Sequence, residues 1–119
     1  MSLFRVSVVA RNTVDQKATP PIDALVDTGS ELTWLPADLL TTAGIVAVRD
    51  RTFHTATRQI VSRKIGYAIL AAEGFETVDE VVFAEPGDMT LVGVRTIEGF
   101  GVMVDAIGHR FVAQATLVA

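Results

Sequence analysis

One short stretch of the chain combines a carboxylate with the small side chains that a tight turn needs. It consists of Asp27, Thr28, Gly29 and Ser30, and the apolar run Ala24-Leu25-Val26 leads into it. Such a run brings a carboxylate to the end of a buried strand, where ionisation is costly unless backbone N–H groups approach closely. Glycine permits that approach. The pattern predicts an aspartate that does chemistry, the alternative being a turn aspartate that bonds only its own backbone.

The run Asp27-Thr28-Gly29 resembles the active-site motif of aspartic proteases, and that resemblance implies peptide hydrolysis by a pair of carboxylates, without a metal or a covalent nucleophile. One carboxylate takes a proton from water while a second, still protonated, polarises the scissile carbonyl. Two carboxylates about 3 Å apart cannot both ionise cheaply, so the pKa of one falls and that of the other rises. The chain has no second Asp-Thr-Gly or Asp-Ser-Gly, and the residues around Asp105 have the wrong spacing. The resemblance therefore implies that the second carboxylate comes from another copy, which a two-fold axis between two Asp27 side chains would supply.

The residue types argue against other catalytic centres. Cysteine is absent, which excludes disulfides, thiolate zinc sites and cysteine nucleophiles. The two histidines, His54 and His109, are far apart in sequence, so we expect no metal site and no cofactor. Ser30 lacks the Gly-x-Ser-x-Gly turn of a serine hydrolase.

Length, composition and charge narrow the class of protein. A chain of 119 residues, half of them apolar, fits a single domain over residues 1–119 with a real core. A net charge of −4 argues against a nucleic-acid partner. No apolar run approaches the roughly 20 residues that cross a bilayer, and the first residues do not resemble a secretory signal. We therefore expect a soluble, cytoplasmic protein without a membrane partner.

The elements that must position Asp27 are predicted to be mostly strands. Period-2 alternation predicts strands at residues 4–9 and 22–26, which form a hairpin across the polar loop 11–21. A short helix is expected at residues 37–40, stopped by Gly44, and another at residues 94–100. Further strands are predicted at residues 45–48, 52–56, 59–70 and 76–83, in a hairpin of 102–105 with 111–113, and at 116–118.

The stretch from Ala24 to Ser30 resembles the active-site loop of aspartic proteases. With a single motif, the chain is similar to the retroviral-type, or retropepsin-like, branch of that family, which occurs also in bacteria. A second mark of the family, two apolar residues and a glycine before a short helix, is matched by Leu91, Val92 and Gly93. The resemblance covers nearly the whole chain in element order. It implies a mainly β, closed-barrel-like acid protease fold with one or two short helices, assembled as a two-fold homodimer.

The resemblance also implies roles for single residues. Asp27 is the catalytic residue, Thr28 hydrogen-bonds across the axis, and the chain termini interleave in a shared sheet, for which the apolar edge strands 4–9 and 116–118 are suited. We expect Ser30 to donate a hydrogen bond to the dyad, which would favour the ionised form and an acidic pH optimum. The family's β-hairpin flap falls at residues 54–60, with its tip at Thr55, Ala56, Thr57 and Arg58. Viral flap tips are rich in glycine, whereas this segment has none.

These observations predict a homodimeric aspartic endopeptidase that acts on a peptide or protein substrate. The alternative is a dimeric peptide-binding or assembly module of the same fold with little or no turnover. Trp34 is interpreted as a core residue beside the active-site strand, with a substrate platform as the alternative.

The charges are unevenly distributed. Five bases, Arg49, Arg51, Arg58, Arg63 and Lys64, precede six acids, Glu73, Glu76, Asp79, Glu80, Glu85 and Asp88. The favoured interpretation is two hairpins of complementary charge, and the alternative is a basic rim that prefers acidic ligands.

Overall fold

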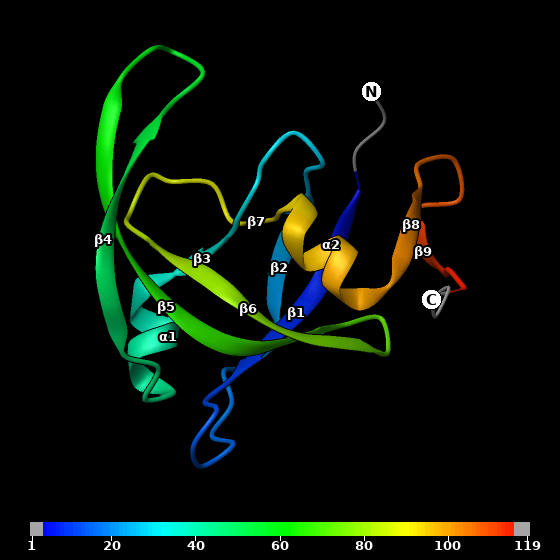
Figure 1. Ribbon diagram of the computed structural model, residues 1–119, viewed down its shortest axis with the longest axis horizontal. Helices are drawn as coiled ribbons and strands as arrows, with labels where there is room; N and C mark the ends of the chain where they lie inside the picture. The colour runs from blue at the N-terminus through cyan, green and yellow to red at the C-terminus, as the bar shows by residue number, and fades with distance from the viewer. Residues whose placement is uncertain (1–3, 116–119) are drawn as a thin grey trace, which may run out of the picture.

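The computed structural model describes residues 4–115. This part of the chain consists of strands, with two short helices between them (Figure 1). The elements are β1 (Arg5–Arg11), β2 (Ile22–Val26), β3 (Thr33–Pro36), α1 (Ala37–Thr42), β4 (Ala47–His54), β5 (Ile60–Ala72), β6 (Phe75–Ala84), β7 (Leu91–Val92), α2 (Val94–Phe100), β8 (Val102–Asp105) and β9 (Arg110–Ala113).

The larger sheet closes on itself. Its strands follow the order β1-β2-β7-β3-β6-β5-β4, and β1 also pairs with β5. The pairing of β1 with both β2 and β5 joins the two sides of the sheet into a barrel, while β4 stays outside the ring as a partner of β5 alone. The predicted mainly β, closed-barrel-like architecture with one or two short helices is confirmed.

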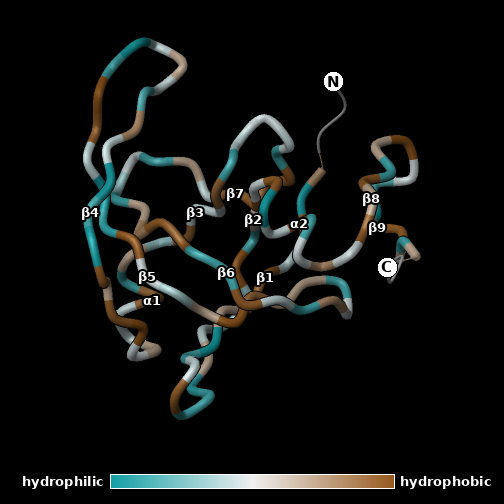
Figure 2. Tube along the Cα trace, viewed as in Figure 1, coloured by the Kyte–Doolittle hydropathy of each residue, from teal (hydrophilic) through white to brown (hydrophobic). Residues whose placement is uncertain are grey.

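Alternation along the strands fills the barrel. Val6, Val8 and Ala10 of β1 face the interior, as do Ala68 and Leu70 of β5, and all are buried. Figure 2 shows strongly hydrophobic stretches where β1, β5 and β6 lie together. Burial of this apolar surface is the main stabilising term of the fold.

The two helices lie against the barrel and are short. The helix α1 has six residues and buries Leu40, and α2 has seven and buries Ile97 and Phe100. No helix within residues 4–115 combines the length and the hydropathy that crossing a bilayer requires.

The structure corrects the sequence prediction in the second half of the N-terminal strand. Residues 4–9 were expected to form an open edge, but β1 pairs with β2 from Arg5 to Val8 and with β5 from Val8 to Arg11. Its second half therefore closes the barrel and offers no free edge. The predicted strand at residues 116–118 lies outside the described residues.

Two other differences concern strands near the site. The strand β3 was not predicted, because its pairing partners, β6 in parallel and β7 at Trp34–Leu91, are distant in sequence. The two predicted pieces at 45–48 and 52–56 form the single strand β4. The ladder with β5 continues through Asp50–Lys64 and Arg51–Arg63, with one irregularity between Ala47 and Arg49.

Candidate active site

Asp27 lies at the end of a strand whose neighbour holds its backbone. The strand β2 ends at Val26, which pairs in parallel with Val92 of β7, and the Asp27 N–H donates to the Val92 carbonyl at 3.0 Å. Asp27 as a whole residue is partly buried, and its carboxylate accepts the Gly29 N–H on Oδ1 at 2.9 Å. A Cβ at Gly29 would lie 3.2 Å from that oxygen, so glycine keeps the approach open. The predicted turn around the carboxylate is present.

Ser30 makes a different contact from the one expected. Its backbone N–H donates to the Asp27 carbonyl at 3.2 Å, while its hydroxyl donates to the Leu32 carbonyl at 2.9 Å. Because a hydroxyl has one proton, that proton is used within the loop and does not reach the Asp27 carboxylate. The prediction that Ser30 donates to the dyad is therefore wrong for this arrangement, and its support for an acidic optimum is lost. The role of Thr28 concerns a second copy and stays a prediction.

The second predicted motif lies directly against the Asp27 loop. The strand β7 runs between β2 and β3, and Gly93 follows it. A Cβ at Gly93 would lie 2.4 Å from the Leu32 carbonyl oxygen, a distance that no side chain tolerates. The first amides of α2 then donate to the loop, from Val94 to the Ser30 carbonyl at 2.8 Å and from Arg95 to the Glu31 carbonyl at 3.1 Å. The junction of β7 and α2 therefore supports the loop that carries Asp27.

A cleft of about 710 Å³ opens beside Asp27. Three segments line it: the Asp27 loop with β3, the hairpin of β4 and β5, and the β6–β7 loop. The lining residues are Asp27, Gly29, Ser30, Glu31, Leu32, Trp34, Phe53, His54, Thr55, Ala56, Thr57, Gln59, Val61, Arg63, Gly87, Asp88, Met89 and Leu91. Most predicted site residues are among them, whereas Thr28, Arg58, Val92 and Gly93 are not.

The expected hairpin between the two motifs is present, and its turn is tight. The Thr55 N–H donates to the Gln59 carbonyl and the Arg58 N–H to the Thr55 carbonyl, both at 2.9 Å. Arg58 has φ 65°, a conformation that glycine adopts more readily. Figure 1 shows the hairpin projecting beyond the rest of the molecule. The turn thus forms without the glycine that viral flap tips use.

Sequence reasoning missed the residues on the inner face of this hairpin. Phe53 and Val61 flank the turn, line the cleft and are partly buried, whereas Thr52 and Ser62 beside them are exposed. Their period-2 alternation on both sides of the turn is the signal that could have identified them. Phe53 packs on Trp34 with ring centroids 4.9 Å apart, so Trp34 belongs to a small apolar cluster and also lines the cleft.

Two bases of the hairpin, Arg51 and Arg63, are paired with acids on the walls of the cleft. Arg51 and Arg63 are opposite each other in the ladder and so share one face. Arg51 Nη2 lies 2.9 Å from Glu31 Oε1, and Arg63 binds Asp88 through two bonds of 2.7 and 2.9 Å. Those bonds from Arg63 hold the pKa of Asp88 below its ordinary value.

Other bases of the same segment are also paired. Arg49 binds Glu80, and Lys64 Nζ lies 3.7 Å from Asp50 Oδ1. Arg49–Glu80 and Arg63–Asp88 join the basic segment to the acidic one, which supports the interpretation of complementary charge, whereas Lys64–Asp50 lies within the β4–β5 hairpin.

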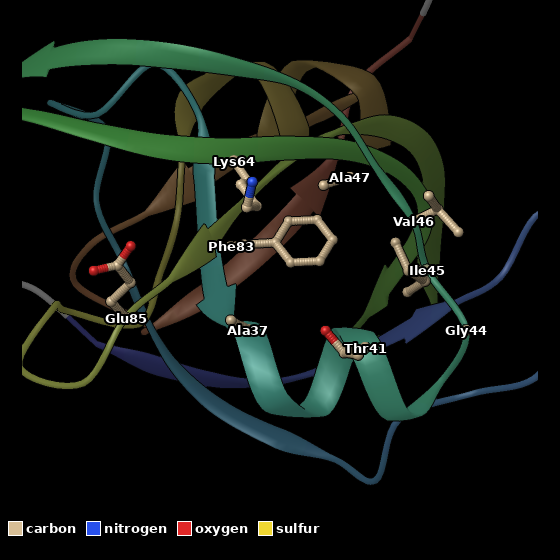
Figure 3. A pocket seen from close by; sticks show the side chains of 9 residues that line it. All are labelled: Ala37, Thr41, Gly44, Ile45, Val46, Ala47, Lys64, Phe83 and Glu85. Carbon is tan, nitrogen blue, oxygen red and sulfur yellow. The ribbon is translucent and has the colours of Figure 1, made fainter.

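A second pocket, of about 460 Å³, lies away from Asp27, between α1, the start of β4 and the end of β6. Figure 3 shows the ring of Phe83 at its centre, with Lys64 and Glu85 on different sides. Lys64 lies 3.7 Å from Asp50 and Glu85 lies 3.7 Å from Arg63, so both charges already have partners. None of the predicted site residues lines this pocket.

Comparisons with known proteins establish the fold and no more. No family model and no curated protein matches the chain. The foamy viral protease-reverse transcriptase in complex with an RNA/DNA hybrid is similar at TM-score 0.58 and 15% identity, covering 99% of this chain and 13% of that one. The foamy viral protease-reverse transcriptase dRH in complex with ds DNA is similar at TM-score 0.53 and 15% identity, covering 77% and 14%. The chain thus spans a small part of those proteins and has a retroviral-protease-like fold, as the sequence predicts.

Proposed function

We propose that two copies of this chain form an aspartic endopeptidase in which a water molecule between two Asp27 carboxylates attacks a peptide bond. One carboxylate takes a proton from the water, and the other, protonated, donates a hydrogen bond to the scissile carbonyl. The two groups titrate as a pair with two apparent pKa values. The substrate is a peptide or protein segment that lies in the cleft beneath the hairpin.

The pairing of the cleft carboxylates supports this proposal most directly. Three carboxylates line the cleft, those of Asp27, Glu31 and Asp88. Glu31 is bound by Arg51 and Asp88 by Arg63, so both carboxylates are engaged by guanidinium groups of the hairpin, and the bonds from Arg63 also hold the pKa of Asp88 below its ordinary value. Asp27 is held instead by a backbone N–H. Within the described residues, the cleft of one chain therefore offers one carboxylate for acid–base chemistry, and a second copy supplies the other.

A peptide library tests the proposal. We expect the unaltered protein to cleave peptides in a pepstatin-sensitive way and to sediment as a dimer. We expect Asp27→Asn to abolish cleavage while the dimer and its unfolding free energy are retained. Asp15→Asn is the matched control, because Asp15 Oδ1 accepts the Lys17 N–H at 2.9 Å, in the same i to i+2 arrangement as Asp27 and Gly29. The absence of pepstatin-sensitive cleavage at any pH, or equal activity of Asp27→Asn, would refute the proposal.

The alternative function, a dimeric module that binds peptides without cutting them, is favoured by two features of the hairpin. The hairpin is held to the body at two points, Arg51–Glu31 and Arg63–Asp88, and its tip lacks glycine. Both features oppose a hairpin that opens and closes at each turnover. Peptide binding of equal affinity by the unaltered protein and by Asp27→Asn, without cleavage by either, would identify this function.

A further inference from the structure

A series of buried polar side chains runs behind the Asp27 loop. Thr33, Thr96 and Asp79 are at most 9% exposed and come from β3, α2 and β6. The Thr33 and Thr96 hydroxyl oxygens are 2.6 Å apart, and the Thr96 hydroxyl donates to Asp79 Oδ2 at 2.9 Å. None of the three residues lines the cleft.

The directions of these hydrogen bonds follow from the carboxylate at the end. The Thr96 hydroxyl donates to Asp79, so its proton is committed there and the Thr96 oxygen must accept from Thr33. The proton of Thr33 is then committed in turn, and its oxygen accepts the Gly93 N–H at 3.0 Å. The whole series thus points from the Gly93 amide to the Asp79 carboxyl group, and hydrogen bonds in such a series strengthen one another.

The peptide group between Val92 and Gly93 connects this series to Asp27. Its N–H donates to Thr33, and its C=O accepts the Asp27 N–H at 3.0 Å. One rigid planar unit is therefore bonded on one side to the residue that carries the proposed chemistry and on the other to the buried series. A change in the orientation of this unit displaces the Asp27 backbone directly.

We propose that Asp79 is a positioning residue for Asp27, acting through Thr96, Thr33 and the Val92–Gly93 peptide group. As far as catalysis is concerned, the inference depends on the proposed function. Burial of a carboxylate and two hydroxyls costs more than burial of similarly shaped apolar side chains. The polar series instead fixes geometry. Its hydrogen bonds allow one orientation of the Val92–Gly93 peptide group and hence one position of the Asp27 backbone.

Amide hydrogen exchange tests the positioning without any need for activity. Asp79→Asn is similar in shape, but its amide has one acceptor oxygen, whereas Asp79 accepts both Thr96 Oγ1 and the Glu80 N–H at 2.7 Å. In Asp79→Asn we expect the Gly93 and Asp27 amides to exchange about tenfold faster than in the unaltered protein, which is the effect of one weakened hydrogen bond. Amides in the β5–β6 ladder are the internal reference and are expected to keep their exchange rates. Asp15→Asn is the matched control and is expected to leave both amides unchanged.

The threonines separate the hydroxyl from the packing of the side chain. Thr33→Val keeps the shape of the side chain and removes the hydroxyl, whereas Thr33→Ser keeps the hydroxyl and removes a methyl group. We expect Thr33→Val to accelerate exchange at Gly93 and Asp27 as Asp79→Asn does, and Thr33→Ser to restore protection. Equal protection of both amides in Asp79→Asn and the unaltered protein, or equal damage by Thr33→Ser and Thr33→Val, would overturn the proposal.

Kinetics adds the catalytic part. Because the series does not line the cleft, we expect Asp79→Asn to lower kcat about tenfold with little change in KM, as expected for a misplaced reacting group. A raised KM with unchanged kcat would overturn the positioning role. If the unaltered protein cleaves nothing, the proposed function fails, and the exchange experiment still decides whether Asp79 orients the loop.

Discussion

The contact between Arg63 and Asp88 allows a quantitative prediction. It joins the hairpin to the β6–β7 loop through two hydrogen bonds of 2.7 and 2.9 Å, and the two side chains are 14% and 18% exposed. Exposed ion pairs contribute about 0.2–1 kcal/mol, and breaking a fully buried pair costs about 3–5 kcal/mol. Because solvent partly screens the Arg63–Asp88 pair, we expect its contribution to the free energy of unfolding to lie between those limits. We therefore expect Arg63→Gln to lower the free energy of unfolding by about 2 kcal/mol near pH 7.

The pH dependence of that loss has a definite sign. The bonds from Arg63 lower the pKa of Asp88 in the folded protein, whereas in the unfolded chain an aspartate has a pKa of about 3.9. A lowered carboxyl pKa contributes stability that is fully present above the unfolded value and is lost as pH falls through the folded value. The cost of Arg63→Gln is therefore expected to be constant from about pH 7 to pH 5 and to shrink below about pH 4.

Urea denaturation measures both quantities. Unfolding free energies are extrapolated at fixed protein concentration, because association with a second copy would add a concentration-dependent term. A double-mutant cycle with Asp88→Asn separates the pair from the other contacts of Arg63, and we expect a coupling energy of about 1–2 kcal/mol. A cost below about 0.5 kcal/mol near pH 7, or a cost that does not change between about pH 7 and pH 3, would refute this reasoning.

Three further substitutions probe the loop and the core. Ser30→Ala removes the hydroxyl bond to Leu32 and should cost about 1 kcal/mol in urea denaturation. Because that hydroxyl does not reach Asp27, the pH–rate profile of cleavage should not move, and a shifted optimum would contradict the assignment. Gly93→Ala places a Cβ 2.4 Å from the Leu32 oxygen and should lower the free energy of unfolding by about 3 kcal/mol or more. If this variant and the unaltered protein had the same thermal unfolding midpoint, that result would contradict the close approach. Leu40→Ala opens a cavity under α1 and should cost about 2–5 kcal/mol in urea denaturation, and a loss below about 1 kcal/mol would show that the core closes around the deletion.

Features that depend on residues close in sequence could be predicted well. The approach of Ala24-Leu25-Val26 to Asp27, the turn at Gly29 and the helix after Gly93 each follow from local alternation and glycine chemistry, and the structure contains all three. The hairpin that carries Phe53 and Val61 was likewise predicted, although its inner face was not.

Features that depend on distant partners could not be predicted. The strand β3 forms because Thr33 pairs with Val81, and nothing in the sequence around Thr33 indicates that neighbour. The series from Gly93 to Asp79 joins three elements through hydroxyls that look like ordinary strand and helix residues. The contact of Ser30 with Leu32 depends on the precise path of the loop, so residue type alone suggested the wrong acceptor.

The guanidinium groups of Arg51 and Arg63 lie opposite each other in the β4–β5 ladder, which affects how the hairpin could move away from the body. If Glu31 released Arg51 alone, the uncovered cation would stand directly opposite Arg63, where like charges repel. The two bonds from Arg63 to Asp88 offset part of that repulsion, because Arg63 already has a bound carboxylate. Movement of the hairpin away from the body therefore requires both ion pairs, Arg51–Glu31 and Arg63–Asp88, to break, because either pair alone still joins the hairpin to a wall of the cleft.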